Sequence, residues 1–431
     1  MKKVFVKLFF ILVAVAFLIY LYNQARQPGD FKVYLEAAQL VWQGKSPYNV
    51  WIFVSEGNYC EYFYSPLWAT ILIPLTYLPS IVANFIWLLV NVFFLLRIGI
   101  ILKKYLVSFN LSRNQMILIF LFTVMCSVRF ILYNFDMIQM TLFLLWGSLE
   151  AIEFMKKEKH WQGGLILALV INIKLLPLVI IPYLIYRKFW KGFTSSIIWS
   201  VLLLFLPGVI VGFEFNNILI SDWLGTINPS NSEFSLETGL GANGLASLVP
   251  SLLTNLDTIE GVPRNIANLS AEKVSFVLNL TRGFFILTVL LVLKMPLFSK
   301  SNSEIQSLRE ISYLLLLVPL IFPHQQKYAF AMCIPAWFYL SFYLVYLHQY
   351  RIEFRGRYIS VLIFFALSFI LMTLTTDGVV GRKMSDYFQY FHTITNGAIL
   401  LAVAIIIAQH QTILSKKEAL QIALSRDDIQ E

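Results

Sequence analysis

Residues 81–102 read IVANFIWLLVNVFFLLRIGIIL, a run that contains a single charge, Arg97. An apolar run of about 20 residues is long enough to cross the hydrocarbon core of a bilayer as a helix. Further runs of this kind lie near residues 1–22, 114–133, 137–154, 193–213, 274–296, 305–323, 328–347, 357–375 and 391–409. The sequence therefore predicts an all-α, polytopic membrane protein.

Two apolar stretches depart from this pattern. The stretch 162–186 is interrupted by Asn172, Lys174 and Pro177, which predicts two short helices that meet at a break. The run 66–79 is short and carries three prolines, which favours a re-entrant or tilted segment over a full crossing.

The composition supports a membrane protein. Of the 431 residues, 58% are hydrophobic and 13% are charged, whereas soluble proteins average about 45–50% and about 25%. These proportions exclude a soluble globular enzyme, a disordered chain and a fibrous protein. The three cysteines, Cys60, Cys126 and Cys333, have no metal-like spacing, so neither a disulfide framework nor a zinc site is expected.

The net charge of +9 comes from small basic clusters beside apolar runs, which indicates topology and not a nucleic-acid surface. If the N-terminus is cytoplasmic, most of the 33 Lys and Arg residues, Arg187 and Arg309 among them, fall on the cytoplasmic side. This distribution predicts about 12 transmembrane helices with both termini cytoplasmic. We expect one transmembrane catalytic domain over residues 1–415, with outer loops 23–65 and 214–273, and a cytoplasmic tail over 416–431.

The outer segments carry unusual polar residues, several of them in short turns at membrane depth. Ionisable groups are costly there, so these residues are functional candidates and together predict a polar cavity that opens outward. The set comprises Asp30, Glu36, Tyr59, Glu61, Tyr62, Tyr64, Asp136, Gln139, Asn172, Lys174, Asp222, Asn243, His324, Gln325, Gln326, Lys327, Asp377, Arg382 and Lys383.

Each candidate also has a purely structural interpretation. Asp30 precedes an amphipathic segment, where its carboxylate would act as a helix N-cap. Lys174 and Arg129 would extend toward the interface, as long basic side chains do near helix ends. Tyr59, Tyr62 and Tyr64 would belong to an interfacial aromatic belt, and His324 to an interfacial turn. The residues alone leave these alternatives open.

Several blocks, in order along residues 29–335, resemble glycosyltransferase family 87, which includes the polyprenyl-phosphate-mannose-dependent mannosyltransferase of phosphatidylinositol mannoside synthesis. The first blocks are GDFKVYLEAA (29–38), GKSPY (44–48) and YFYSPL (62–67). The later blocks are NFDMIQ (134–139), the helix that ends in Lys174-x-x-Pro177, NGLASL (243–248) and His324-x-x-x-Tyr328. Two blocks depart from the family: its Gly-Gln-x-Asn pattern is not intact in 134–139, and Asn243 is followed by glycine instead of glutamine.

The resemblance implies a GT-C fold, in which a helical membrane core carries an active site on the outer face. It also implies a polyprenyl-phosphate hexose donor, with mannose the expected sugar, and a lipid or glycan acceptor. The chain is then a multi-pass protein of the inner (plasma) membrane whose site faces the periplasm or the outside. No cofactor is expected, and metal independence is predicted because the chain has no Asp-x-Asp pair.

The predicted roles follow from what glycosyl transfer requires. Asp30 is the expected general base, since a partly desolvated carboxylate has a raised pKa. Lys174, His324, Lys327 and Arg129 are the candidates for the donor phosphate. The candidates for sugar or acceptor are Tyr34, Tyr62, Tyr64, Asp136, Gln139 and Asn243. The alternatives are a transporter or flippase of lipid-linked or small solutes, which would gather its polar residues near the midplane, and a non-catalytic assembly scaffold.

Overall fold

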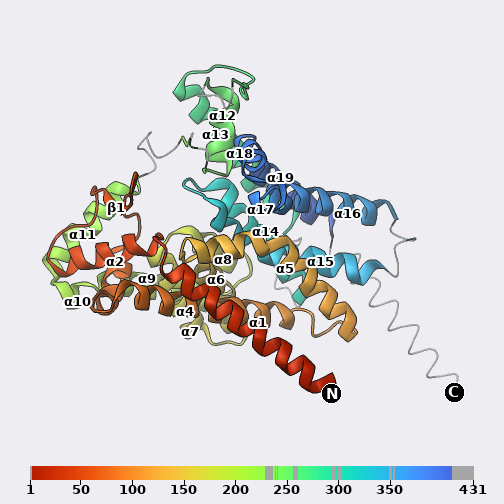
Figure 1. The fold of residues 1–431 in the computed structure, drawn as a ribbon, viewed down its shortest axis with the longest axis horizontal. Coiled ribbons are helices and arrows are strands. Elements are labelled where there is room, and N and C mark those ends of the chain that lie inside the picture. The colour runs from red at the N-terminus through yellow and green to blue at the C-terminus, as the bar shows by residue number, and fades with distance from the viewer. Residues whose placement is uncertain are drawn as a thin grey trace. The chain divides into compact units, whose positions relative to one another are not determined.

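The computed structural model of the protein describes residues 2–228, 236–237, 239, 241–255, 261–293, 298, 303–348, 352 and 355–409. Helices make up most of this part of the chain (Figure 1), as the sequence predicts. The exception is one antiparallel hairpin, β1 (Ile52–Ser55) and β2 (Asn58–Cys60), in which Phe53 pairs with Tyr59. Gly57 adopts a φ of 72° at its turn, where a glycine is favoured.

The chain divides into two compact units, each described separately. Unit 1 comprises the described residues of Met1–Ile101, Ile131–Ile185 and Phe189–Ser230, and unit 2 those of Leu102–Phe130, Tyr186–Lys188 and Asn231–Glu431. Unit boundaries fall inside three helices, α4 (Ser80–Lys104), α5 (Arg113–Asp136) and α8 (Ile180–Tyr186). The single catalytic domain over 1–415 remains a prediction, and the expected tail over 416–431 lies outside the described residues.

Unit 1 contains the hairpin, most of α4 and the last residues of α5. Its other elements are α1 (Lys2–Ala25), α2 (Phe31–Trp42), α3 (Pro66–Leu72), η1 (Ile73–Tyr77), α6 (Thr141–Lys156), α7 (His160–Ile173), η2 (Leu176–Val179), α8 (Ile180–Tyr186), α9 (Trp190–Phe205), α10 (Gly208–Val211) and α11 (Phe213–Thr226). The last residue of α8, Tyr186, already belongs to unit 2.

Unit 2 contains most of α5. Its other described elements are α12 (Leu245–Leu253), α13 (Ala271–Thr288), η4 (Val289–Leu291), α14 (Glu304–Ile321), η5 (Lys327–Cys333), α15 (Ile334–Leu347), α16 (Arg355–Phe369), the π-helix η7 (Ile370–Leu374), α17 (Asp377–Val380), α18 (Arg382–Tyr390) and α19 (Thr393–Ile407).

Six helical segments among the described residues are long and apolar enough to cross a membrane, and a bent pair, α18 with α19, makes a seventh if it is one span. The six are Ser80–Lys104, Arg113–Asp136, Trp190–Val211, Ala271–Leu291, Lys327–Leu347 and Arg355–Leu374. The predicted count of about 12 spans and the cytoplasmic location of both termini therefore remain predictions.

The break predicted within 162–186 is present. Helix α7 ends at Ile173, Lys174 takes an extended conformation, and α8 follows after the short η2. Small residues set the packing of α7: a Cβ on Gly164 would lie 2.2 Å from Ser195 Oγ of α9, and a Cβ on Gly147 of α6 would lie 2.3 Å from Val170 Cγ1. These close approaches hold the α7 end, and thus Lys174, against α6 and α9.

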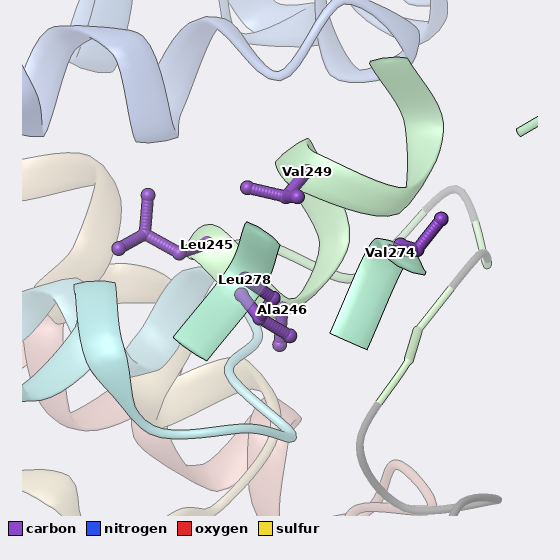
Figure 2. Packing of buried hydrophobic residues seen from close by; sticks show 5 residues of the cluster. All are labelled: Leu245, Ala246, Val249, Val274 and Leu278. Atoms are coloured by element: carbon purple, nitrogen blue, oxygen red, sulfur yellow. The ribbon is translucent and has the colours of Figure 1, made fainter. Parts of the chain in front are cut away.

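One apolar cluster of unit 2 joins α12 to α13. Leu245, Ala246 and Val249 of α12 pack with Val274 and Leu278 of α13, and all five are buried (Figure 2). The cluster anchors the start of α12, directly after Gly244, whose φ of 85° and 2.6 Å Cβ distance to the Pro319 carbonyl oxygen exclude a side chain there.

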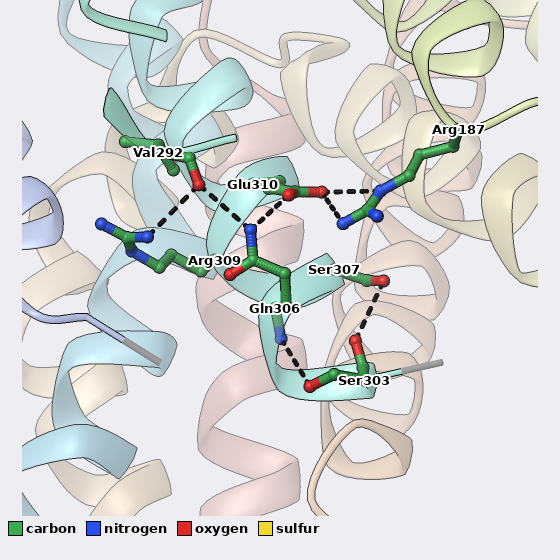
Figure 3. A network of polar contacts seen from close by, with 7 residues as sticks. All are labelled: Arg187, Val292, Ser303, Gln306, Ser307, Arg309 and Glu310. Carbon is green, nitrogen blue, oxygen red and sulfur yellow. Dashed lines mark hydrogen bonds and ion pairs between the residues drawn. The ribbon is translucent and has the colours of Figure 1, made fainter. Parts of the chain in front are cut away.

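A buried polar network in unit 2 centres on Glu310 (Figure 3). Arg187 donates to Glu310 Oε2 through Nε, at 2.8 Å, and through Nη2. Gln306 Nε2 donates to Glu310 Oε1 and, at 3.0 Å, to the Val292 carbonyl oxygen. Arg309 Nη1 donates to the same carbonyl oxygen at 3.2 Å. Arg187 and Glu310 are thus removed from water as an ion pair, and the buried Arg309 donates to carbonyl oxygens.

Two basic residues that the sequence places on the cytoplasmic side belong to this network. Arg187 and Arg309 are each only 3% exposed. Besides its bond to Val292, Arg309 donates to the carbonyl oxygens of Ile405 and Ile406 at the end of α19, at 3.2 and 3.0 Å. Both arginines therefore bind the protein itself, and their location on the cytoplasmic side remains a prediction.

We predict that Glu310→Ala lowers the stability of the protein by about 3–5 kcal/mol, because Arg187 would be left buried without its carboxylate. Thermal melting of the purified protein in detergent measures the loss. The control is Glu214→Ala, which removes an exposed glutamate at the start of α11 and should change melting little.

The double variant Arg187→Met, Glu310→Leu should melt closer to wild type than either single change, since apolar residues replace a buried pair at small cost. An alanine variant that melts with the wild type would show that the network does not stabilise unit 2.

Candidate functional site

The candidate site of unit 1 begins where two turns meet, one before α2 and one after α5. The backbone N–H of Asp30 donates to the carbonyl oxygen of Met137 at 3.0 Å. A Cβ on Gly29 would lie 3.0 Å from that oxygen and 3.0 Å from Ile138 Cγ1, so a larger residue would require these neighbours to shift by a few tenths of an ångström. The contact joins residues more than 100 positions apart in the sequence.

A buried asparagine shapes the second turn. Asn134 accepts at Oδ1 from the Thr141 N–H at 3.2 Å and donates through Nδ2 to Asn91 Oδ1 at 3.1 Å. Ile138 has a φ of 50°, a conformation that costs energy for a β-branched residue and is typical of functional sites. Asn134 is not among the residues predicted from the sequence, although it begins the NFDMIQ block. The signal that could have identified it is an amide side chain directly after an apolar run.

The Asp30 side chain binds Gln139 and does not cap α2. Gln139 Nε2 donates to Asp30 Oδ2 at 2.5 Å, whereas no capping hydrogen bond to the helix start is formed. The structural interpretation of Asp30 as an N-cap is therefore wrong in the described structure.

The environment of Asp30 makes its carboxyl group more basic. Burial raises the pKa of Asp30 above its ordinary value, while the Gln139 hydrogen bond and the positive charge of Lys174 lower it and offset the burial only in part. A carboxylate with this balance is a better proton acceptor near neutral pH than an exposed aspartate.

Tyrosines surround the amide of Gln139. Tyr34 Oη lies 2.9 Å from Gln139 Oε1 and 2.8 Å from Tyr64 Oη. Tyr62 donates to the Ser65 carbonyl oxygen at 3.0 Å. Tyr34, Tyr62 and Tyr64 are 1%, 0% and 7% exposed, whereas Tyr59 is 53% exposed. The first three are thus interior residues, and only Tyr59 fits an interfacial belt.

Tyr48, which sequence analysis quoted but did not select, belongs to the same cluster. Its hydroxyl donates to the Tyr64 carbonyl oxygen at 2.8 Å, and its ring centroid lies 5.6 Å from that of Tyr62. Burial raises the pKa of Tyr48 and of Tyr62, so both phenols stay neutral at physiological pH.

Lys174 is the phosphate candidate that the structure brings to Asp30. Its ammonium nitrogen lies 5.2 Å from the ring centroid of Tyr64, within the range of a cation–π contact, and its charge acts on the Asp30 carboxyl. Asp136 is directed elsewhere, since its Oδ1 accepts from the Tyr20 hydroxyl at 2.6 Å. Of the candidates in unit 1, Asp30, Gln139, Tyr34, Tyr64 and Lys174 therefore form one cluster.

Three further phosphate candidates belong to unit 2. Arg129 is buried and donates through Nη1 to the Met372 carbonyl oxygen at 2.8 Å and to Thr375 Oγ1 at 2.9 Å. It fastens the end of η7. Lys327 lies within electrostatic range of Arg129 and of two carboxylates, Asp377 and Asp386.

His324 and Asn243 lie in one loop pair of unit 2. The Asn243 N–H donates to the Gln325 carbonyl oxygen at 2.8 Å, and Asn243 Nδ2 donates to Gly241 at 3.0 Å. His324 Nδ1 lies 2.7 Å from Glu237 Oε1, and its φ is 57°. A carboxylate thus already contacts His324, which sequence analysis did not anticipate because Glu237 is distant in the chain.

No group of three or more His, Cys, Asp or Glu side chains that could hold a metal ion occurs among the residues described. Metal independence itself remains a prediction, as do the roles assigned to the individual site residues.

The helices of bilayer length indicate a membrane protein, and the acid–amide–tyrosine cluster is its candidate site. The chain belongs to glycosyltransferase family 87, whose sequence model matches residues 62–323, and the family predicted from the sequence blocks is confirmed. The matched range includes Tyr64, Gln139 and Lys174 and leaves Asp30 outside it. No curated protein matches the chain.

The raised pKa of Asp30 gives a stability prediction with a definite sign. The folded state binds this proton more tightly than the unfolded state, so the stability from Asp30 is present at low pH and is lost as pH rises through the folded pKa. Asp30→Asn removes the cost of the buried charge. We expect the variant to melt at or above the wild-type temperature at pH 7, with the difference shrinking as pH falls.

Asp377→Asn is the matched control of opposite sign. A hydrogen bond from Thr376 lowers the pKa of the Asp377 carboxyl, so its stability is present above the unfolded pKa and is lost on acidification. That variant should melt below wild type at pH 7. An Asp30→Asn variant that is less stable at pH 7, and more so than at low pH, would contradict the assignment.

Proposed function

We propose that the protein transfers a hexose, with mannose the expected sugar, from a polyprenyl-phosphate donor to a lipid or glycan acceptor on the outer face of the membrane. Membership of family 87 supports glycosyl transfer. We further propose a lipid-linked donor and a helical core of the GT-C type. The helices of bilayer length support both.

The observation that carries the proposal is the state of Asp30. Its carboxylate is half-buried, is held at one oxygen by Gln139 Nε2 and lies near the charge of Lys174. The carboxylate does not cap α2, so helix capping does not explain why a charge is kept in this costly, partly buried position. A basic carboxylate beside a cation is what an acceptor hydroxyl and a phosphate leaving group require.

In the proposed reaction, the acceptor hydroxyl oxygen attacks the anomeric carbon of the donor sugar while Asp30 takes its proton. A new glycosidic C–O bond forms and the C–O bond to the phosphate breaks. The electron pair of that bond leaves with the polyprenyl phosphate, whose charge the Lys174 ammonium stabilises. A single displacement of this kind inverts the anomeric centre.

The phosphate candidates differ in how free their charges are for a ligand. Lys174 contacts an aromatic ring, so its ammonium retains hydrogen-bond donors for an anion. Arg129 is engaged with the η7 end, and His324 with Glu237. We therefore propose Lys174 as the principal phosphate residue.

Neither alternative function gains support. Family membership gives no indication of a transporter or flippase, and a scaffold would not need a carboxylate with a raised pKa. We place the reaction on the periplasmic or outer side of the plasma membrane, which follows from the basic residues of the predicted inner loops.

We predict that Asp30→Asn abolishes transfer, with the rate falling by roughly 10²–10⁴-fold, the usual contribution of a general base. The asparagine oxygen still accepts from Gln139, so the fold and donor binding should persist. The measurement is turnover of a synthetic polyprenyl-phosphate hexose by the purified protein, together with a melting curve. Wild-type turnover by the folded variant would refute Asp30 as the base.

We also predict that Lys174→Ala weakens binding of a polyprenyl-phosphate analogue at least tenfold, since one charge-assisted hydrogen bond contributes about 1.5–3 kcal/mol. Lys45→Ala, which removes an exposed lysine of unit 1, is the control and should bind as wild type. Equal affinity of the two variants would remove Lys174 from the phosphate site.

A further inference from the structure

The two oxygens of the Asp30 carboxylate are not equivalent. Oδ2 accepts from Gln139 Nε2 at 2.5 Å. Among the described residues, none donates a hydrogen bond to Oδ1. One oxygen is therefore fixed by the protein, and the other keeps its lone pairs for a ligand.

The amide of Gln139 is held in one orientation. Its Oε1 accepts from the Tyr34 hydroxyl at 2.9 Å and from the Met140 N–H at 3.2 Å. A rotated amide would set its NH₂ group against the Met140 donor and its oxygen against the Asp30 carboxylate, two repulsive contacts. The Nε2 group must therefore face Asp30.

Proton counting gives the hydrogen bonds a single direction. A phenol has one proton, and the amide oxygen of Gln139 can only accept, so Tyr34 donates to Gln139. The Tyr34 and Tyr64 hydroxyls lie 2.8 Å apart, so Tyr64 also contacts this chain. Tyr34 donates to Gln139 and Gln139 donates to Asp30, and hydrogen bonds aligned in this way strengthen one another.

Burial separates this chain from direct substrate contact. Gln139 is 2% exposed and Tyr34 is 1% exposed, and Trp87 Nε1 donates to the Gln139 carbonyl oxygen at 3.3 Å. The rings of Phe31 and Tyr64 contact Tyr34, with centroid distances of 5.8 and 4.7 Å. A sugar would have no access to these groups without repacking the cluster.

We propose that Gln139 is a positioning residue which, together with Tyr34 and Tyr64, holds Oδ2 of Asp30 so that Oδ1 faces the acceptor hydroxyl. This inference rests on the proposed role of Asp30 as the base. It replaces sugar or acceptor binding as the role of Gln139, Tyr34 and Tyr64. Gln139 acts only through Asp30 and touches no reacting atom.

The proposal predicts how activity depends on pH. The Gln139 hydrogen bond favours the ionised carboxylate, so its loss makes Asp30 easier to protonate. The acid limb of the kcat–pH profile, which reports protonation of the base, should then move to higher pH. If Gln139 instead bound the sugar, its loss would raise KM and leave the acid limb in place.

The test compares Gln139→Met with Tyr34→Phe in the purified full-length protein, using a polyprenyl-phosphate hexose as the donor. Gln139→Met removes the hydrogen-bond donor to Asp30 Oδ2 and nearly keeps the side-chain volume. We expect its kcat at neutral pH to fall about tenfold and its acid limb to move up by about one pH unit. This size follows because a hydrogen bond to a charged group contributes at least as much free energy as one pKa unit. Its KM should change little.

Tyr34→Phe is the milder variant, because the Met140 N–H still orients the amide. We expect a shift of the acid limb in the same direction and of smaller size. Tyr390→Phe is the matched control: it removes a buried tyrosine hydroxyl of unit 2 that donates to a main-chain carbonyl oxygen, that of Val262 at 2.7 Å, and that does not belong to the Asp30 cluster. It should melt like Tyr34→Phe and keep the wild-type acid limb.

Three results would overturn the proposal: a wild-type acid limb in both Gln139→Met and Tyr34→Phe, a rise in KM alone, or an equal shift in Tyr390→Phe. Tyr34→Phe keeps the test decisive if Gln139→Met fails to fold. Asp30→Asn distinguishes a failure of the positioning role of Gln139 from a failure of Asp30 as the base. If that variant is inactive while the acid limbs stay fixed, only the positioning role fails; if it is active, the proposed base fails with it.

Discussion

The hydrogen bond from the Asp30 N–H to the Met137 carbonyl oxygen is the contact on which the candidate site depends. It joins the turn before α2 to the turn after α5, and Gly29 permits the approach. Without this contact, Asp30 and Gln139 would belong to unrelated segments. With it, the carboxylate and the amide meet at 2.5 Å, and the tyrosines of α2 and of the loop before α3 complete the cluster.

Two kinds of buried charge occur in the described structure, and they differ in how fully they are satisfied. Glu310 has both oxygens occupied by Arg187 and Gln306, which is the arrangement of a structural network. Asp30 has one oxygen occupied and a raised pKa. A charge whose environment leaves it basic and partly unpaired is costly to keep, and such costs are typical of functional sites.

Much of the fold could be predicted from the sequence, because apolar runs and proline breaks are local signals. The helices occupy the predicted runs, and the break at Lys174 is where Asn172 and Pro177 indicate it. The burial of Arg187 and Arg309 could not be predicted, since their partners come from other elements and a basic residue at a helix end normally signals topology. The hairpin 52–60 was also missed, because a short hairpin gives little periodicity.

The candidate site was predicted in part. Asp30, Gln139, Tyr34, Tyr64 and Lys174 were selected as expensive polar residues or from family blocks, and they lie together. The separate roles of these residues could not be predicted from the sequence, because they depend on burial and on which atom of the Gln139 amide faces which neighbour. Asn134 and Tyr48 were passed over for the same reason, as each acts through contacts with residues elsewhere in the chain or in the cluster.

The most direct test of the central claim is a donor comparison with the purified protein in lipid nanodiscs. A polyprenyl-phosphate mannose and a nucleotide-linked mannose are each supplied with a membrane lipid extract as acceptor, and released polyprenyl phosphate or nucleotide is measured by mass spectrometry. The account predicts release of polyprenyl phosphate together with a mannosylated lipid or glycan, and no turnover of the nucleotide sugar. Turnover of the nucleotide sugar alone would contradict it.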